Sequence, residues 1–244
     1  MRTRILYFLL SIGCLFLIYK TFKSNLTKVI KYPNFGIRIP AGYEIHGIDV
    51  SRYQSEIDWG QVVKMRDRGQ KISFVIIKST EGLRLKDPHF EYNWEKSKAN
   101  KLIRGAYFYF RANCDAESQA QFYINNTKLT SGDLPPIIDI EDNFNLPPSK
   151  IRESLKKCIK VLENKYNKKP IIYTGAHFYK KNLGEEFDEY PLWVAHYGNV
   201  NAPQVGRNWA MWQHSERGRV NGIVGHVDFN VFKGSHKSLL SMCL

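Results

Sequence analysis

The stretch Leu134–Asp142, which reads L-P-P-I-I-D-I-E-D, places two carboxylates two residues apart at the end of an apolar run. Its prolines fit the first positions of a strand, where a missing hydrogen-bond donor is tolerated, and its isoleucines favour a short buried strand. Because side chains alternate along a strand, Asp139 and Glu141 point to the same side, with Cα atoms about 6.5–7 Å apart. The sequence therefore predicts two acids on one face of a strand end.

Two neighbouring acids in an apolar setting favour an acid beside a base. Desolvation and like-charge repulsion raise the pKa of one carboxyl, while the other stays ionised. Glycoside hydrolysis needs this pair: one carboxyl protonates the leaving oxygen and the second stabilises the developing cation. A helix N-cap or a solvated acidic turn is the alternative interpretation, and the pair alone does not exclude it.

The chain of 244 residues is long enough for one large α/β domain or two small ones. Residues 1–40 hold seven of its 36 lysines and arginines and no acid, so they supply more than half of the formal net charge of +13. No basic run with interleaved aromatic residues stands out, and we predict no nucleic-acid partner. The remaining positive charge suits an anionic polymer such as a cell wall or a membrane surface, and equally serves solubility alone.

The cysteines predict neither a zinc site nor a redox motif, because Cys14, Cys114, Cys158 and Cys243 form no C-x-x-C spacing. Cys158 falls on the apolar face of an expected helix, so we expect a buried thiol there. A bridge between Cys114 and Cys243 is left open. The sequence implies no metal and no organic cofactor.

Residues 1–23 are predicted to be a signal anchor or a signal peptide, because two arginines precede the apolar run Ile5–Tyr19. Fifteen residues are short for a bilayer span, where about 20 are typical. No small-x-small cleavage site follows, which favours an uncleaved anchor with residues 5–19 in the membrane. We therefore expect export, with the domain in the periplasm or outside the cell. Residues 24–42 are expected to form a polar tether and residues 43–236 the catalytic domain.

Apolar runs and helical patterns alternate through this domain. The expected strands are Ile45–Val50, Ile72–Ser79, Ile103–Phe110, Pro136–Glu141, Pro170–Thr174, Leu192–His196, Trp209–His214 and Val227–Phe232. The expected helices are Ile57–Arg68, Pro88–Asn100, Asp115–Thr127, Ser149–Tyr166 and, more weakly, Ala176–Glu189. Alternation predicts a parallel sheet, and eight strands suggest closure into a TIM-like α/β barrel with its site at the carboxyl ends of the strands.

Several of these strand ends carry polar or aromatic groups. They are Asp49, Lys78, Tyr107, Tyr109, Asp139, Glu141, Tyr173, Trp193, His196, Gln213, His214, Asp228 and Asn230. Each has an ordinary structural interpretation when it is taken singly. Acids and aromatic rings that converge on one rim point to sugar binding, because sugars stack on aromatic faces and hydrogen-bond to carboxylates.

At this point the motifs resemble those of the glycoside hydrolase family 25 lysozymes, the Chalaropsis-type muramidases. The matching motifs are H-G-I-D-V-S-R-Y-Q (46–54) with I-D-W (57–59), F-V-I-I-K-S-T-E-G (74–82), G-A-Y-F-Y-F-R (105–111), P-I-I-D-I-E (136–141), I-I-Y-T-G (171–175), P-L-W-V-A-H-Y (191–197), W-Q-H-S (212–215) and H-V-D-F-N-V-F (226–232). They run in family order and cover about residues 45–233. Any one motif is weak, whereas eight in order are a strong signal.

The resemblance implies an irregular barrel of five β/α units followed by three strands. It also implies cleavage of the β-1,4 bond between N-acetylmuramic acid and N-acetylglucosamine in peptidoglycan. Glu141 then resembles the general acid, and Asp139 the group that stabilises the intermediate or orients the acetamido group. The supporting carboxylates would be Asp49 and Asp228. The expected substrate contacts are Tyr107, Tyr173 and Trp193, with Lys78 and Gln213 as further candidates.

One position departs from the family pattern, because Phe108 stands where the family usually has histidine. Phe108 lies on the strand face opposite Tyr107, so we expect altered packing and retained chemistry.

Two other functions stay open: a chitinase-like N-acetylglucosaminidase, and an envelope protein that binds glycan without cutting it. The sequence lacks the longer D-x-x-D-x-D-x-E run of chitinases, and its intact acids argue against a pure binder.

Overall fold

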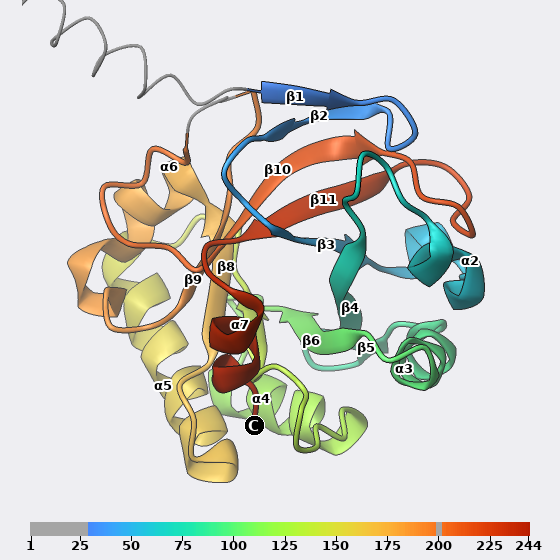
Figure 1. The fold of residues 1–244 in the computed structure, drawn as a ribbon. Helices are drawn as coiled ribbons and strands as arrows, with labels where there is room; N and C mark the ends of the chain where they lie inside the picture. The colour runs from blue at the N-terminus through green and yellow to red at the C-terminus, as the bar shows by residue number, and fades with distance from the viewer. Residues whose placement is uncertain (1–28, 199–201) are drawn as a thin grey trace, which may run out of the picture.

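Eight strands close into a barrel in the computed structural model, which describes residues 29–198 and 202–244 (Figure 1). The barrel strands are β3 (Ile45–Val50), β4 (Ile72–Glu81), β6 (Ile103–Tyr109), β7 (Ile137–Asp139), β8 (Ile171–Gly175), β9 (Leu192–Ala195), β10 (Met211–Gly218) and β11 (Val227–Phe232). They follow one another around the barrel in chain order, and β3 closes it by pairing with both β11 and β4. The strands run parallel except β11, which is antiparallel to both neighbours.

Helices follow the first five barrel strands, as the sequence predicts. They are α2 (Trp59–Lys64), α3 (Phe90–Ala99), α4 (Ala116–Asn126), α5 (Pro148–Tyr166) and α6 (Ala176–Phe178). The short α6 continues as a π-helical turn, η2 (Tyr179–Leu183), and a 3-10 turn, η3 (Gly184–Phe187). The described residues between β9 and β11 form no helix, which confirms five β/α units followed by three strands. Two further short elements, η1 (Arg52–Gln54) and β5 (Leu85–Lys86), lie beside the strand ends.

Successive side chains of each strand point to opposite faces, so the apolar residues form two hydrophobic cores, one inside the barrel and one beneath the helices. Ile137 points into the barrel, where it packs in the cluster that contains Phe74, whereas Ile138 packs in the outer cluster beneath the helices. One end of the barrel is closed by α7 (His236–Met242), which contributes Leu239 to the inner cluster (Figure 1). Asp139 therefore follows Ile137 onto the inner face, at the opposite, open end.

The expected polar tether at residues 24–42 is wrong over residues 29–40, which form a hairpin. Its strands are β1 (Val29–Tyr32) and β2 (Ile37–Pro40), paired in antiparallel register. At its turn, Phe35 is fully buried, with its ring centroid 5.1 Å from that of Phe229 on β11. The stretch is polar and contains proline and glycine, which is why the sequence predicts a tether. Its apolar residues nevertheless alternate, and they pack against β10 and β11.

The expected domain end at residue 236 is also corrected by the structure. Helix α7 continues the domain, and the backbone of Leu244 both donates to Asp133 (2.9 Å) and accepts from Gly132 (3.1 Å). The chain from the hairpin to Leu244 therefore packs as one unit in the described residues.

Replacing Phe35 with alanine is expected to lower the free energy of unfolding by about 3–5 kcal/mol, the usual cost of emptying a buried aromatic site. Urea denaturation followed by circular dichroism measures this change. Lys31→Ala, an exposed substitution on the same hairpin, is the control and should leave the unfolding midpoint within error. Equal, small effects of both substitutions would mean that the hairpin is a loose tether after all.

In the described residues no helix is long and apolar enough to cross a bilayer. The predicted signal anchor at residues 1–23 lies outside these residues.

Cys114, Cys158 and Cys243 are free thiols, so the bridge between Cys114 and Cys243 that the sequence left open is not formed in this structure. Cys158 is buried on α5, as expected. Phe108 is also buried on the outer face of the barrel, against Tyr123.

Candidate active site

The side chains named from the sequence gather at the open end of the barrel. Their places are Asp49 on β3, Lys78 on β4, Tyr107 on β6, Asp139 on β7, Glu141 just after β7, Tyr173 on β8, Trp193 on β9, Gln213 on β10 and Asp228 on β11. Some of these residues lie directly opposite one another on neighbouring strands: Asp139 is in register with Tyr173, and Tyr173 is in register with Trp193. Parallel strands end at this rim and antiparallel β11 starts there, so Asp228 joins the group.

The carboxyls of Asp139 and Glu141 share a hydrogen bond but differ in their exposure to solvent. Asp139 is only 5% exposed, while Glu141 lies at the exposed rim with its carboxyl turned toward Asp139. Burial and the Glu141 charge hold the pKa of Asp139 well above its ordinary value. Desolvation also raises the pKa of Glu141, against the hydrogen bond from Asp139 and the Lys78 charge. The pair therefore keeps one proton to a higher pH than isolated carboxyls do.

A second acid pair faces the first across the open end. Asp49 and Asp228 are directly opposed in the β3–β11 register and share a side-chain hydrogen bond. Burial raises the pKa of Asp49 to about 6. Desolvation, with the Asp49 charge as the next cause, raises the pKa of Asp228 to about 8. The charge on Glu141 contributes to both shifts, which places the two pairs in one electrostatic unit.

Neutral donors hold Asp49 in place beneath this unit. One Asp49 oxygen accepts hydrogen bonds from Gln213 Nε2 (2.8 Å) and Asn230 Nδ2 (2.7 Å). The Asn230 carbonyl in turn accepts from Trp193 Nε1 at 2.7 Å. The Gln213 carbonyl accepts from the hydroxyl of Tyr173 at 2.7 Å. This chain of bonds fixes both amide orientations and keeps two donors on the Asp49 carboxylate.

The expectation that Trp193 contacts the substrate is corrected by its burial. Its side chain is 1% exposed, with its ring centroid 4.2 Å from that of Tyr173. Tyr173 is itself only 7% exposed, and Gln213 is 2% exposed. A covered ring has no free face for a sugar, so these three groups form the floor that orients Asp49. Tyr107, which is half-buried, keeps its predicted place on the wall of the site.

Lys78 lies beside the first acid pair, where side chains at the rim of the barrel hold its ammonium group. Its Nζ donates to Glu81 at 2.8 Å and lies 5.3 Å from the ring centroid of Tyr109. Glu81 also accepts from Arg111, so one carboxylate joins two cations. The Lys78 charge lowers the pKa of both Asp139 and Glu141, although burial outweighs it. Lys78 therefore limits how far the acid pair is neutralised.

Sequence reasoning missed the functional candidates Glu81, Arg111 and Tyr197, and it named Tyr109 only as one of the groups at the strand ends. Tyr109 pairs in register with Asp139, and burial raises the pKa of its hydroxyl to about 12. Tyr197 is 44% exposed, and its hydroxyl donates to Gln213. The signal for Tyr109 was its place two residues after Tyr107, on the same strand face and nearer the rim. For Tyr197 it was the position just beyond a strand end.

Replacing Asn230 with leucine is expected to reduce kcat/KM about tenfold at neutral pH, the usual value of a hydrogen bond to a charged group. Loss of one donor raises the pKa of Asp49 further, so the acidic limb of the pH–rate profile should move to higher pH. The profile of Asn125→Leu, an exposed helical substitution, serves as the control. A uniform loss of rate with an unmoved profile would show that Asn230 supports only the fold.

The arrangement supplies an exposed acid, a buried carboxylate beside it and a second acid pair opposite. The exposed carboxyl can give a proton to a group that enters from solvent, while the buried one holds negative charge next to the reacting centre. This division of labour suits cleavage of an acetal between two sugars.

Comparison with known proteins points to one family. The model named Glycosyl hydrolases family 25 matches residues 48–223. The chain is 48% identical over 206 residues to Uncharacterized protein YegX of Escherichia coli O6:H1, covering 84% of this chain and 76% of that relative. It is 34% identical over 214 residues to Lysozyme M1 of Streptomyces globisporus, covering 81% of this chain and 71% of the lysozyme.

A solved structure agrees with these relatives. The bacterial lysozyme from Streptomyces coelicolor superposes with a TM-score of 0.75 at 30% sequence identity. The match covers 83% of this chain and 98% of that lysozyme. The likeness therefore extends over most of this chain and nearly the whole of that lysozyme.

Proposed function

Because this chain belongs to glycosyl hydrolases family 25, we propose that it is a peptidoglycan muramidase that cleaves the β-1,4 bond between N-acetylmuramic acid and N-acetylglucosamine. It is a glycoside hydrolase with an α/β barrel, and relatives named as lysozymes support the choice of substrate. The observation that carries the proposed chemistry is the unequal exposure of Asp139 and Glu141, which share one hydrogen bond.

Glu141 is the general acid in this proposal. Its proton passes to the glycosidic oxygen as the bond from that oxygen to the anomeric carbon breaks. Asp139, buried beside it, stabilises the positive charge that develops on the muramic acid ring or orients its acetamido group. A water molecule then completes hydrolysis at the anomeric carbon, and its proton returns to the carboxylates. Asp49 and Asp228 tune the pKa of the first pair through their charge.

The rival function of a non-cutting glycan binder fits the acid pairs less well. A binder gains nothing from a carboxyl that is only 5% exposed and whose pKa burial holds well above its ordinary value, as is the case for Asp139. Burying such a group costs free energy, and enzymes retain it where the reaction needs it. A chitinase-like N-acetylglucosaminidase shares the acid pair and is separated from a muramidase by its products.

Digestion of purified peptidoglycan and of chitin by the full chain tests the proposed substrate. We expect soluble fragments from peptidoglycan, with N-acetylmuramic acid at their reducing ends, and none from chitin. Mass spectrometry after borohydride reduction assigns the ends. Reducing N-acetylglucosamine ends would mean a glucosaminidase, and binding without release of fragments would mean an envelope binder.

We further propose that residues 1–23 act as a signal anchor, with residues 5–19 in the bilayer and the domain in the periplasm or outside the cell. The support is the basic-flanked apolar run Ile5–Tyr19. Fractionation of cells that express the full chain should leave it in the membrane pellet after an alkaline wash. Recovery of the whole chain in the soluble fraction would overturn this assignment.

A further inference from the structure

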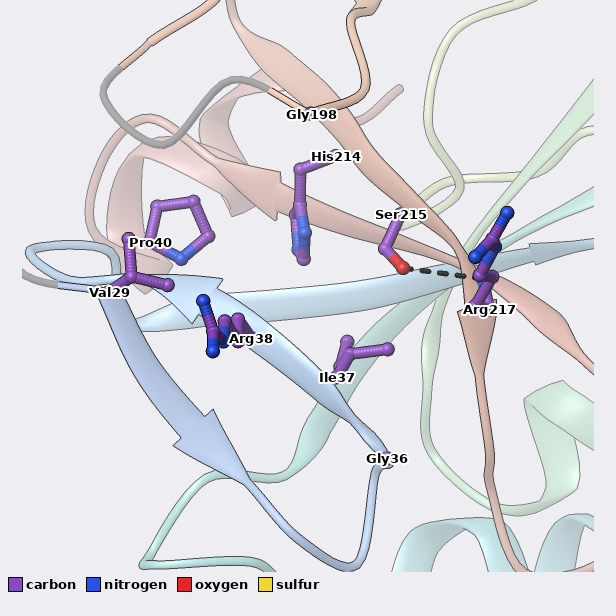
Figure 2. A pocket seen from close by; sticks show the side chains of 9 residues that line it. All are labelled: Val29, Gly36, Ile37, Arg38, Pro40, Gly198, His214, Ser215 and Arg217. Carbon is purple, nitrogen blue, oxygen red and sulfur yellow. Dashed lines mark hydrogen bonds between the residues drawn. The ribbon is translucent and has the colours of Figure 1, made fainter.

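A cavity of about 440 Å³ lies between the β1–β2 hairpin and β10, away from the carboxylates. Figure 2 shows the hairpin side chains on one side of this space and those of β10 on the other, with the imidazole of His214 pointing toward the hairpin. The polar lining consists of Arg38, His214, Ser215 and Arg217, and the apolar lining includes Ile37 and Pro40.

The cavity lies behind the strand that holds the active-site floor. Gln213 turns inward to bind Asp49, whereas the next residue, His214, turns outward into the cavity. Gly198, at the edge of the cavity, directly follows Tyr197, whose hydroxyl donates to Gln213. A ligand in the cavity would therefore lie next to the active site, across the thickness of β10.

Positive charge and free donors characterise the cavity. None of its lining residues is acidic, and neither Arg38 nor Arg217 forms an ion pair with any described residue. Arg104 and Arg152, in contrast, are paired with carboxylates elsewhere. His214 is 7% exposed, and its Nε2 has no hydrogen-bond partner within the described part of the chain. Guanidinium groups without a partner favour an anion such as a carboxylate.

The other wall favours an anion that carries an aliphatic group. Val29, Ile37 and Pro40 line the hairpin side of the cavity. These residues lie outside the segment 48–223 that matches the family model. A short peptide offers both features, because its carboxylates alternate with aliphatic side chains and backbone.

We propose that this cavity binds a carboxylate of the peptide branch that peptidoglycan carries on its muramic acid residues. Arg38 and Arg217, at different ends of the cavity, supply the positive charge that attracts the carboxylate, and the hairpin wall packs against the adjoining aliphatic atoms. This inference rests on the proposed function, because it assigns part of the same substrate to a second site. It makes the enzyme selective for glycan that still bears its peptides.

The test compares two substrates, intact peptidoglycan and glycan strands from which an amidase has removed the peptides. The variant is the full chain with Arg38→Gln and Arg217→Gln. The control is Arg68→Gln with Lys71→Gln, which removes two exposed positive charges from the turn before β4. We expect KM on intact peptidoglycan to rise about tenfold in the variant, the usual value of a charge-assisted hydrogen bond. Its kcat, and its kinetics on bare glycan, should match those of the control.

Calorimetric titration with the released peptides separates this inference from the proposed function. Wild-type chain should bind the peptides and the double variant should not, whether or not either protein cleaves glycan. If wild type cleaves neither substrate, the proposed function fails, but loss of peptide binding in the variant still supports the site. Equal KM values for variant and control on intact peptidoglycan would overturn the inference. So would equal losses on both substrates, or displacement of the peptides by inorganic phosphate as readily as by acetate.

Discussion

Replacing Glu141 with glutamine is expected to lower the rate of peptidoglycan hydrolysis by about 10²–10⁴-fold, the usual contribution of a general acid. Glutamine has the shape of the carboxylic acid but carries no proton that it can give to the leaving oxygen. Glu141 lies at the exposed rim, so its removal should leave the unfolding midpoint and the affinity for glycan nearly unchanged. Turbidity loss of a peptidoglycan suspension measures the rate.

Two comparisons show whether the loss comes from proton donation. Glu185→Gln, an exposed substitution on η3, should keep the wild-type rate. An aryl glycoside with an acidic phenol as its leaving group needs no protonation, so Glu141→Gln should cleave it far better than it cleaves peptidoglycan. A variant that is equally slow on both substrates would assign Glu141 another role.

Replacing Asp139 with asparagine is expected to reduce kcat by about 10²–10³-fold, as for the loss of one group that stabilises charge in the transition state. Asparagine keeps the shape of the buried side chain but cannot carry the negative charge that the cationic ring needs. The exposed N-cap substitution Asp115→Asn is the control and should leave kcat unaltered, because asparagine caps a helix equally well.

The same substitution should make the fold more stable above acidic pH. The folded state holds the pKa of Asp139 well above its ordinary value of 3.8 and also raises that of Glu141, so the pair keeps a proton that the unfolded chain releases. In the window between these two pKa values the wild type therefore loses stability as pH rises. Asparagine does not titrate, so Asp139→Asn should unfold at a higher midpoint than wild type at pH 7 and at a similar midpoint near pH 3. A lower midpoint for the variant at pH 7 would contradict the desolvation that we assign to Asp139.

The sequence predicts the barrel well because strand alternation is a local signal. The expected bounds of β3 and β11 agree with the structure, and both acid pairs lie where strand ends place them. The helix expected over 176–189 breaks into three segments, and it changes type at Gly184, which has a φ of +70°. The hairpin was missed because the burial of Phe35 depends on a partner ring, Phe229, that lies far along the chain.

The side-chain network of the site could not be predicted in the same way. Residue types at strand ends do not show which amide faces which carboxylate, so the bonds from Gln213 and Asn230 to Asp49 appear only in the structure. The same limit explains the wrong expectation for Trp193: aromatic rings at a rim and in a floor have the same sequence signal. Its burial follows from the neighbouring ring of Tyr173 and the acceptor on Asn230.

The most direct test of the central claim counts new reducing ends in one peptidoglycan sample treated with the full chain, with wild type and Glu141→Gln in parallel. Wild type should generate reducing N-acetylmuramic acid continuously, and the variant should generate almost none while it still sediments with the polymer. Comparable production of these ends by both proteins would contradict the assignment of Glu141 and of the acid pair as the catalytic centre.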